Sequence, residues 1–250
     1  MLRQQTLEKM RAMRLDAMAR EFDRQVSSPE LAELSFEERV GMLADIEWTD
    51  REQRKVSRRL SAAKLRHSAS LEDVDYKTRR GLERQVVLAL GTCGWIRDHH
   101  SVIVIGPTGV GKSYLACAFA ERACRSGFSA LYVRAPRLIH DLAVARGDGS
   151  YGRLLTRLAK TELLAIDDWL LNPLKDSERR DLIEVIEDRA ERASTLVATQ
   201  LPVASWHEAI GEATLADAIC DRLIHGAHKL ELSGPSMRGR AARKPSKAGE

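Results

Sequence analysis

The feature that most constrains this chain is a short apolar run that breaks into a glycine-rich loop. Residues 102–105 read Val-Ile-Val-Ile, and residues 106–113 follow with the pattern G-x-x-x-x-G-K-S. This pattern cradles phosphates when a buried strand precedes it and a helix follows it. Residues 114–124 read as that helix, so the required context is present. The sequence therefore predicts a phosphate-binding loop in an α/β fold.

Each residue type in the loop suits a nucleotide. Glycines let backbone N–H groups turn toward phosphate oxygens, and the next helix points its positive end at the same place. Lys112 can reach the β- and γ-phosphates, and the Ser113 hydroxyl can ligate Mg²⁺. The expected nucleotide-binding residues are Gly106, Pro107, Thr108, Gly109, Val110, Gly111, Lys112, Ser113 and Tyr114.

Composition sets broad limits on the protein class. A chain of 250 residues with 44% hydrophobic residues can form one substantial domain and an appendage. The formal net charge of +4 permits a polyanionic partner, whereas 5% aromatic residues disfavour recognition by base stacking. The chain opens without a signal peptide and has no apolar run of membrane-spanning length, so we expect a cytoplasmic protein without a membrane partner.

Strand and helix patterns alternate along the rest of the chain, which favours a parallel sheet covered on both faces. We expect strands at residues 102–105, 129–133, 163–166, 195–199 and 228–232, and helices at residues 82–90, 114–124, 136–146, 151–160, 177–192, 206–210 and 213–225. The predicted domains are a helical domain at 1–70, an α/β domain at 71–233 and a basic, disordered tail at 234–250.

The first domain is predicted to be all α. Residues 4–26 have the spacing of one amphipathic helix, and capping boxes at 35–38 and 49–52 predict a second and a third helix. The third helix, to residue 66, contains Glu52 as its only acid, so its basic stripe suits DNA phosphates, an acidic protein or simply solvent. The candidate DNA-binding residues in this helix are Arg51, Arg54, Lys55, Arg58 and Arg59.

Polar residues follow two of the predicted strands. Asp167 and Asp168 end the third strand, where ligands gather in open α/β sheets. Asp167 is expected to join Ser113 at Mg²⁺, and Asp168 is expected to orient the attacking water. Thr199 and Gln200 end the fourth strand and could help to position that water. The catalytic residues predicted from these motifs are Lys112, Asp167, Asp168 and Thr199.

These motifs bring a family resemblance into view. The chain resembles the IstB-like family of AAA+ ATPases, which are helper proteins of insertion-sequence transposases, related to the DnaC helicase loader and more distantly to DnaA. The resemblance covers nearly the full length and is carried by residues 34–39, 64–66, 106–113, 147–152, 163–169, 198–202, 206–207, 215–219 and 221–223. The phosphate loop is generic, whereas the last four stretches are much more specific to the family.

The resemblance implies an AAA+ core without a full C-terminal lid domain, and an ATPase that uses ATP and Mg²⁺. It implies assembly of a homo-oligomer, ring or helical, on duplex DNA, and recruitment or activation of the transposase of the same insertion element. Thr199 matches the sensor position and Arg222 the arginine finger that completes a neighbour's site. Arg134, Arg137 or Lys160 would face DNA, and Arg238 would match a second sensor.

Three other functions remain open from the sequence. A replicative helicase loader of DnaC type would share the ATPase core and differ in its client. A P-loop kinase for a small molecule would turn over as a monomer without DNA. A nucleotide-gated binding protein would hydrolyse ATP barely or not at all.

Overall fold

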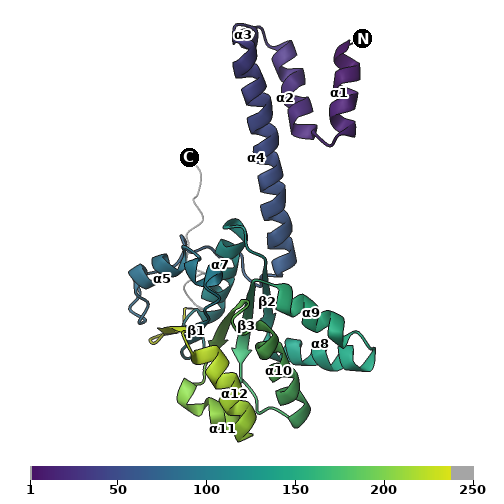
Figure 1. The fold of residues 1–250 in the computed structure, drawn as a ribbon. Helices are drawn as coiled ribbons and strands as arrows, with labels where there is room; N and C mark the ends of the chain where they lie inside the picture. The colour runs from purple at the N-terminus through teal and green to yellow at the C-terminus, as the bar shows by residue number, and fades with distance from the viewer. Residues whose placement is uncertain (1, 238–250) are drawn as a thin grey trace. The chain divides into compact units, whose positions relative to one another are not determined.

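The computed structural model describes residues 2–237 (Figure 1). Its contacts divide the chain into two compact units, with the division between Arg58 and Arg59 in the sequence. We call these parts unit 1 and unit 2. The predicted domain boundary at residue 70 stays a prediction. Arg238 and most of the predicted tail lie outside the described residues.

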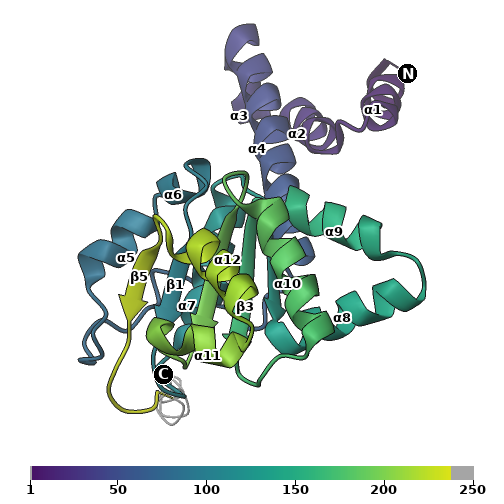
Figure 2. The ribbon, with the colours of Figure 1, turned by 60° about the horizontal axis from the view of Figure 1, so that its bottom comes forward.

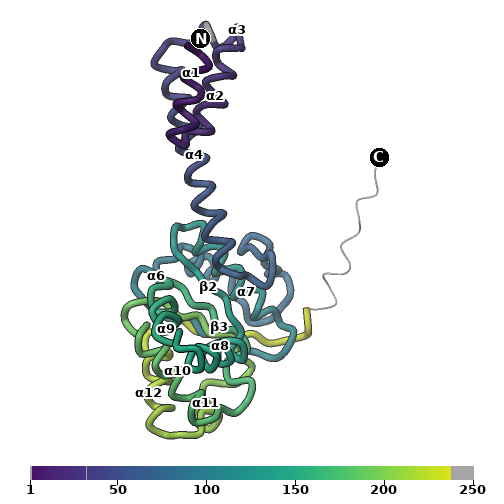
Figure 3. The backbone as a smooth tube through the Cα atoms, turned by 90° about the vertical axis from the view of Figure 1, so that its right-hand side faces the viewer, coloured from purple at the N-terminus to yellow at the C-terminus, as the bar shows by residue number. Residues whose placement is uncertain are grey.

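Unit 1 is helical, and its N-terminal part is a hairpin where one helix was predicted. The chain turns back at Arg14, which has a φ of 59°. The Arg3 guanidinium donates hydrogen bonds to the Asp23 carboxylate and to the Ser27 hydroxyl, and these bonds join the two ends of the hairpin. The turn lets Leu7 on one helix and Ala19 on the next be buried within the unit. The helices that begin in this unit are α1 (Leu2–Ala12), α2 (Asp16–Ser27), α3 (Pro29–Ala32) and α4 (Phe36–Ala63), and Figure 3 traces their path.

The predicted second and third helices are a single helix, α4. Its capping box is real: the Ser35 N–H donates to the Glu38 carboxylate, and the Glu38 N–H donates to the Ser35 hydroxyl. Thr49 and Glu52 have the same spacing but lie inside the helix. The residues between Glu38 and Thr49 include no proline, and their single glycine, Gly41, is tolerated within the helix.

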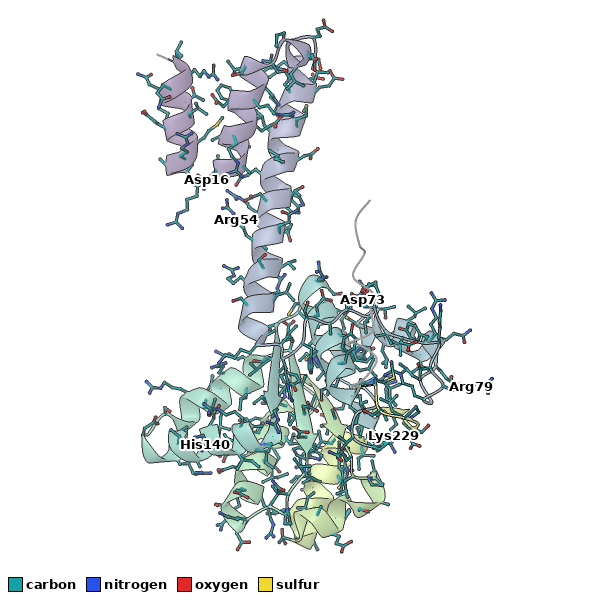
Figure 4. All side chains as sticks on the ribbon, turned by 180° about the vertical axis from the view of Figure 1, so that it is seen from behind. Asp16, Arg54, Asp73, Arg79, His140 and Lys229 are labelled. Carbon is teal, nitrogen blue, oxygen red and sulfur yellow. The ribbon has the colours of Figure 1, made fainter. Side chains whose placement is uncertain are left out.

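A continuous α4 changes the charge balance of the basic stripe. Asp50 forms an ion pair with Arg54 at 2.7 Å, and Asp16 at the start of α2 lies 3.8 Å from the same guanidinium. Figure 4 shows Asp16 and Arg54 side by side. Glu47 pairs with Arg51 at 2.9 Å, and Glu52 pairs with Lys55. The expectation that Glu52 is the only acid beside these cations was therefore wrong.

Unit 2 contains a five-stranded sheet in the order β2-β3-β4-β1-β5, and every pair is parallel. This confirms the predicted fold class. The strands are β1 (Val102–Ile105), β2 (Ala130–Arg134), β3 (Leu163–Trp169), β4 (Ser194–Thr199) and β5 (His228–Glu231). Strand β3 is longer than predicted, so Asp167 and Asp168 lie within the strand and not after it.

Helices cover both faces of the sheet, as the continuous apolar strands require. Val102 and Val104 pack on one face with α7, whereas Ile103 packs on the other face with α8 to α12. Figure 2 views the face that α10, α11 and α12 cover. The helices of unit 2 are α5 (Arg84–Leu90), α6 (Gly94–Arg97), α7 (Lys112–Arg125), α8 (Ala135–Gly147), α9 (Tyr151–Lys160), α10 (Asp176–Arg189), α11 (Trp206–Ile210) and α12 (Ala213–Ile224), with a 3₁₀ turn at Val203–Ser205.

A buried cation helps to hold the second face together. Arg189 at the end of α10 is 1% exposed, and it donates hydrogen bonds to the carbonyl groups of Leu158, Thr161 and Ser194. These bonds tie α9 and α10 to the start of β4. Among the residues that the structure describes, none of the helices combines the length and apolar character that a bilayer crossing requires.

Glu47 supplies a polar contact between α2 and α4. Glu47 is 4% exposed, and its carboxylate accepts a hydrogen bond from the Met18 N–H in the first turn of α2. Burial by itself raises the pKa of Glu47, but the bonds from Met18, Arg51 and Ala17 outweigh burial and hold the pKa below its usual value.

We expect Glu47→Ala to lower the free energy of unfolding by about 1–3 kcal/mol, because it leaves backbone N–H groups of α2 without their acceptor. The stabilisation should be complete above the usual glutamate pKa of about 4.3 and should disappear as the pH falls through the lower pKa of the folded state. Urea denaturation across this pH range measures both effects. Glu52→Ala, on the same helix but in an exposed ion pair, should change stability by less than about 0.5 kcal/mol.

Candidate nucleotide-binding site

The parallel register brings the ends of three strands together at one edge of the sheet. Ile105 at the end of β1 is paired with Thr199 at the end of β4, and Trp169 at the end of β3 is paired with the same Thr199. The Gly106 N–H donates to the Thr199 carbonyl at 3.2 Å. The phosphate loop, the paired acids and the end of β4 therefore meet at the carboxyl edge, where α/β sheets bind ligands.

The phosphate loop has the backbone that its glycines permit. Gly109 has a φ of 89° and Gly111 a φ of 102°, values that other residues rarely adopt. Lys112 begins α7 and is 8% exposed, and its ammonium donates to the carbonyl groups of Gly106 at 2.7 Å and Pro107 at 2.9 Å. The ammonium is thus held over the loop by backbone oxygens, a position from which it can turn to a phosphate.

Ser113 and Tyr114 occupy the first turn of α7, as the motif predicts. The hydroxyl of Tyr114 donates to the Ser70 carbonyl at 3.5 Å, and its ring packs against the core on that face of the sheet. This hydrogen bond directs the Tyr114 side chain toward Ser70 and not toward the loop. Tyr114 therefore contributes to packing beside the loop.

The two acids of β3 have different surroundings. Asp167 is 1% exposed and accepts hydrogen bonds from the Tyr132 hydroxyl at 2.6 Å and from the Asp168 N–H at 3.0 Å. Burial, together with the Asp167 carboxylate, raises the pKa of Tyr132, so this phenol keeps its proton and donates it to the hydrogen bond. Tyr132 was not singled out from the sequence, although its place on the strand beside β3 is a signal that could have found it.

Asp168 is more accessible than Asp167 and is already paired. Its backbone has a φ of 56°, which is uncommon for a residue other than glycine. The Arg134 guanidinium at the end of β2 donates to the Asp168 carboxylate at 2.6 Å. The structure thus places Arg134, a candidate for DNA contact, directly on the candidate water-orienting acid.

Thr199 and Gln200 differ sharply in their surroundings. Thr199 is fully buried; its hydroxyl donates to the Trp169 carbonyl at 2.9 Å and accepts from the Leu201 N–H at 3.0 Å. Gln200 is exposed, and its side-chain oxygen accepts a hydrogen bond from the Thr108 hydroxyl of the phosphate loop at 2.7 Å. Gln200 is therefore the residue of this pair whose side chain contacts the loop, whereas the Thr199 hydroxyl holds β3 and β4 together.

The remaining candidates lie on helices, and most of them are paired with acids. Arg222 on α12 contacts Glu187 on α10 at 2.9 Å, and Arg137 on α8 contacts Asp141 at 2.9 Å. In unit 1, Arg51, Arg54 and Lys55 are paired as described above. Among the ion pairs of the described residues, none involves Arg58 or Arg59.

The sequence that carries this loop, its lysine and the two acids matches a protein-family profile. The sequence profile described as "IstB-like ATP binding protein" matches residues 8–245. This chain belongs to the IstB-like ATP-binding protein family. Residues 8–245 are nearly the whole chain, so membership includes both the helical unit and the α/β unit.

Relatives and solved structures agree with this assignment. The insertion sequence ATP-binding protein y4pL of Sinorhizobium fredii is 49% identical over 98% of this chain and 100% of its own length. The DnaC helicase loader has a similar fold, with a TM-score of 0.53 and 20% identity over 68% of this chain and 99% of its own. DnaA bound to AMPPCP and single-stranded DNA has a TM-score of 0.56 and 15% identity over 68% of this chain and 51% of its own. The IstB-like chain thus has an AAA+ fold and relatives named for insertion sequences.

We expect the two residues at the end of β4 to respond differently to substitution. Thr199→Val should lower the free energy of unfolding by about 1–3 kcal/mol, because the Trp169 carbonyl and the Leu201 N–H both lose their hydrogen-bond partner. Gln200→Ala, at an exposed side chain, should change stability by less than about 0.5 kcal/mol. Thermal and urea unfolding of both variants measure the difference, and equal stabilities would show that the Thr199 hydroxyl does not hold β3 and β4 together.

Proposed function

We propose that this IstB-like chain is an ATPase that assembles on duplex DNA and recruits or activates the transposase of the same insertion element. The observation that carries the proposal is the meeting of the phosphate loop, Asp167, Asp168 and Gln200 at one sheet edge. This set supplies a phosphate grip, a metal carboxylate and a group for water, which are the parts that ATP hydrolysis needs.

The residues at this edge suit a magnesium nucleotide. Ser113 and Asp167 offer hydroxyl and carboxylate oxygens, the hard donors that Mg²⁺ prefers. When bound, Mg²⁺ would supply positive charge to the β- and γ-phosphates. Lys112 would exchange the carbonyl groups of Gly106 and Pro107 for phosphate oxygens, so its charge is already close to where it is needed.

Asp168 is proposed to orient the attacking water, with Gln200 beside it. In the protomer Asp168 accepts a hydrogen bond from Arg134, and a carboxylate held in this way is less free to accept one from water. Contact of Arg134 with a DNA phosphate would compete with this ion pair. This competition would link DNA binding to the catalytic acid.

The site is proposed to be completed by a neighbouring protomer. Arg222 would act there as an arginine finger that stabilises the charge of the transition state. Its guanidinium is partly exposed and its partner Glu187 is more so, with side-chain exposures of 32% and 47%. An ion pair this accessible to solvent is weak, so Arg222 can exchange Glu187 for a phosphate at little cost.

DNA contact is proposed through phosphates and not through bases. Arg58 and Arg59 are the cations of the α4 stripe without an acid partner among the described ion pairs, while Arg54 and Lys55 would exchange the partly exposed carboxylates of Asp50 and Glu52 for phosphates. Arg51 would exchange the buried carboxylate of Glu47 for a phosphate at a greater cost. Guanidinium and ammonium groups that meet only the backbone give affinity without sequence preference.

A helicase loader is the second candidate function, favoured by the similar fold of the DnaC helicase loader. The two functions share the ATPase cycle and differ in the client protein. Capture of purified transposase or purified helicase by the ATP-bound chain distinguishes them. Binding of the helicase alone would replace the transposition proposal.

The central test is to measure the ATPase rate and the particle size, with and without duplex DNA, over a range of protein concentrations. We expect ATP-dependent assembly on DNA and a rate that rises with assembly. A chain that stays monomeric and ignores DNA when saturated with a non-hydrolysable ATP analogue would contradict the proposal. Turnover by that monomer on a small-molecule acceptor would favour a kinase.

We expect Arg222→Ala to bind ATP nearly as the wild type does, while its turnover in the assembled state falls at least about 100-fold. Arg180→Ala, which removes an exposed arginine of α10, is the matched control and should keep the wild-type rate. Lys112→Ala should lose ATP-driven assembly altogether. Normal hydrolysis by Arg222→Ala would show that the site is not shared in this way.

We expect Arg58→Ala to weaken DNA binding to a similar extent on unrelated sequences and to reduce the slope of log affinity against log salt by about 1. Fluorescence anisotropy with labelled duplexes at several salt concentrations measures both quantities. Lys9→Ala removes an exposed cation of α1 in the same unit and serves as the control for net charge. A slope change equal to that of the control would argue against phosphate contact by Arg58.

A further inference from the structure

The phosphate loop is enclosed by two segments that are far from it in the sequence, residues 75–81 and 232–237. Each loop glycine is approached by one of them. A Cβ atom at Gly106 would overlap the Leu232 carbonyl oxygen, one at Gly109 would overlap the Ser236 hydroxyl, and one at Gly111 would overlap the Arg80 guanidinium. The loop glycines are therefore needed for these approaches as well as for the backbone curl.

The two segments also hold each other. The Ser233 N–H donates to the Arg80 carbonyl at 2.9 Å, and the Leu232 N–H donates to the Ile105 carbonyl at the end of β1 at 2.7 Å. A Cβ atom at Gly81 would overlap the Glu231 carbonyl oxygen. The loop thus lies in a fixed frame of backbone.

Arg80 is a charged side chain that reaches the loop from this frame. The residue is 4% exposed, and its guanidinium donates to the Val110 carbonyl at 2.6 Å and to the Asp75 carbonyl at 3.1 Å. Its Nε atom is buried and has no hydrogen-bond partner within the described part of the chain. Among the ion pairs of that part, none includes Arg80, so its charge beside the loop is not neutralised by a contacting carboxylate.

The Val110 carbonyl matters because of the peptide that it belongs to. A trans peptide is planar, so its C=O and its N–H point in opposite directions. A donor that holds the Val110 carbonyl therefore fixes the Gly111 N–H in the opposite direction, away from Arg80. The Met237 N–H donates to the Gly109 carbonyl at 2.8 Å and turns the Val110 N–H in the same way.

We propose that Arg80 is a positioning residue for nucleotide binding, which orients the Gly111 N–H toward the phosphates and adds positive charge beside the loop. The inference rests on the proposed binding of ATP by this loop. Hydrogen bonds to a charged donor are stronger than neutral ones, and a preformed loop need not be ordered when the nucleotide binds.

The test is titration of the full-length protein with fluorescent AMP, ADP and ATP analogues, for the wild type and for Arg80→Ala, Arg80→Lys and Arg79→Ala. We expect Arg80→Ala to weaken ADP binding about 10- to 100-fold, the range expected for loss of a charged hydrogen bond. Arg80→Lys should recover part of the affinity, because an ammonium keeps the charge but not the two-pronged donor geometry. Arg79 is exposed and is labelled in Figure 4, and its substitution should change affinity less than twofold.

The nucleotide series separates positioning from a general loss of structure. The loss for Arg80→Ala should grow from AMP to ADP to ATP, while thermal unfolding without nucleotide confirms that each variant is folded. If Arg80→Ala does not fold, Arg80→Lys carries the test. Affinities within twofold of the wild type for a folded Arg80 variant would overturn the inference. A wild type that binds no nucleotide would instead contradict the proposed function.

Discussion

The parallel pairing of β4 with β1 and β3 is the constraint on which the rest of the site depends. Thr199 ends the central strand, and its carbonyl and hydroxyl bond both neighbours, at Gly106 and at Trp169. These short backbone contacts place the phosphate loop and the paired acids at one edge without any ligand. A shift of one residue in this register would move the acids away from the loop and would turn buried side chains to the wrong face of the sheet.

Carboxylates already hold several of the cations to which we assign a role in assembly. Arg134 pairs with Asp168, Arg222 pairs with Glu187, and Arg54 and Lys55 on α4 pair with Asp50 and Glu52. Ion pairs with exposed members contribute about 0–1 kcal/mol each, so a phosphate can replace the carboxylate at small cost. The same pairs keep the separate protomer from presenting unbalanced charge. The arrangement suits a protein whose partners are polyanions.

The loop differs from these cations in that backbone contacts hold it in place. Residues 75–81 and 232–237 touch the loop through backbone carbonyls, backbone N–H groups and the buried Arg80 side chain. Buried bonds of this kind are costly to leave unmade, so the loop backbone is held in one conformation. A loop held by backbone contacts thus lies beside cations whose ion pairs are partly exposed.

The sequence alone predicted the α/β class, the strands, the loop from Gly106 to Ser113 and the acids Asp167 and Asp168, because these depend on local apolar runs and on a motif of fixed spacing. It preferred Thr199 to Gln200 as a catalytic residue, although the Gln200 side chain is bonded to the loop, and it missed Tyr132 and Arg80, because these roles come from contacts between residues far apart in the chain. It also divided α4 at Thr49 and joined α1 to α2, since neither a capping box nor an apolar period depends on how the helices pack. Local pattern thus determined the fold class, the strands and a candidate phosphate loop, whereas the tertiary structure alone decided where the N-terminal helices end, which side chains meet at the loop and which charges are already paired, because burial and pairing depend on the whole fold.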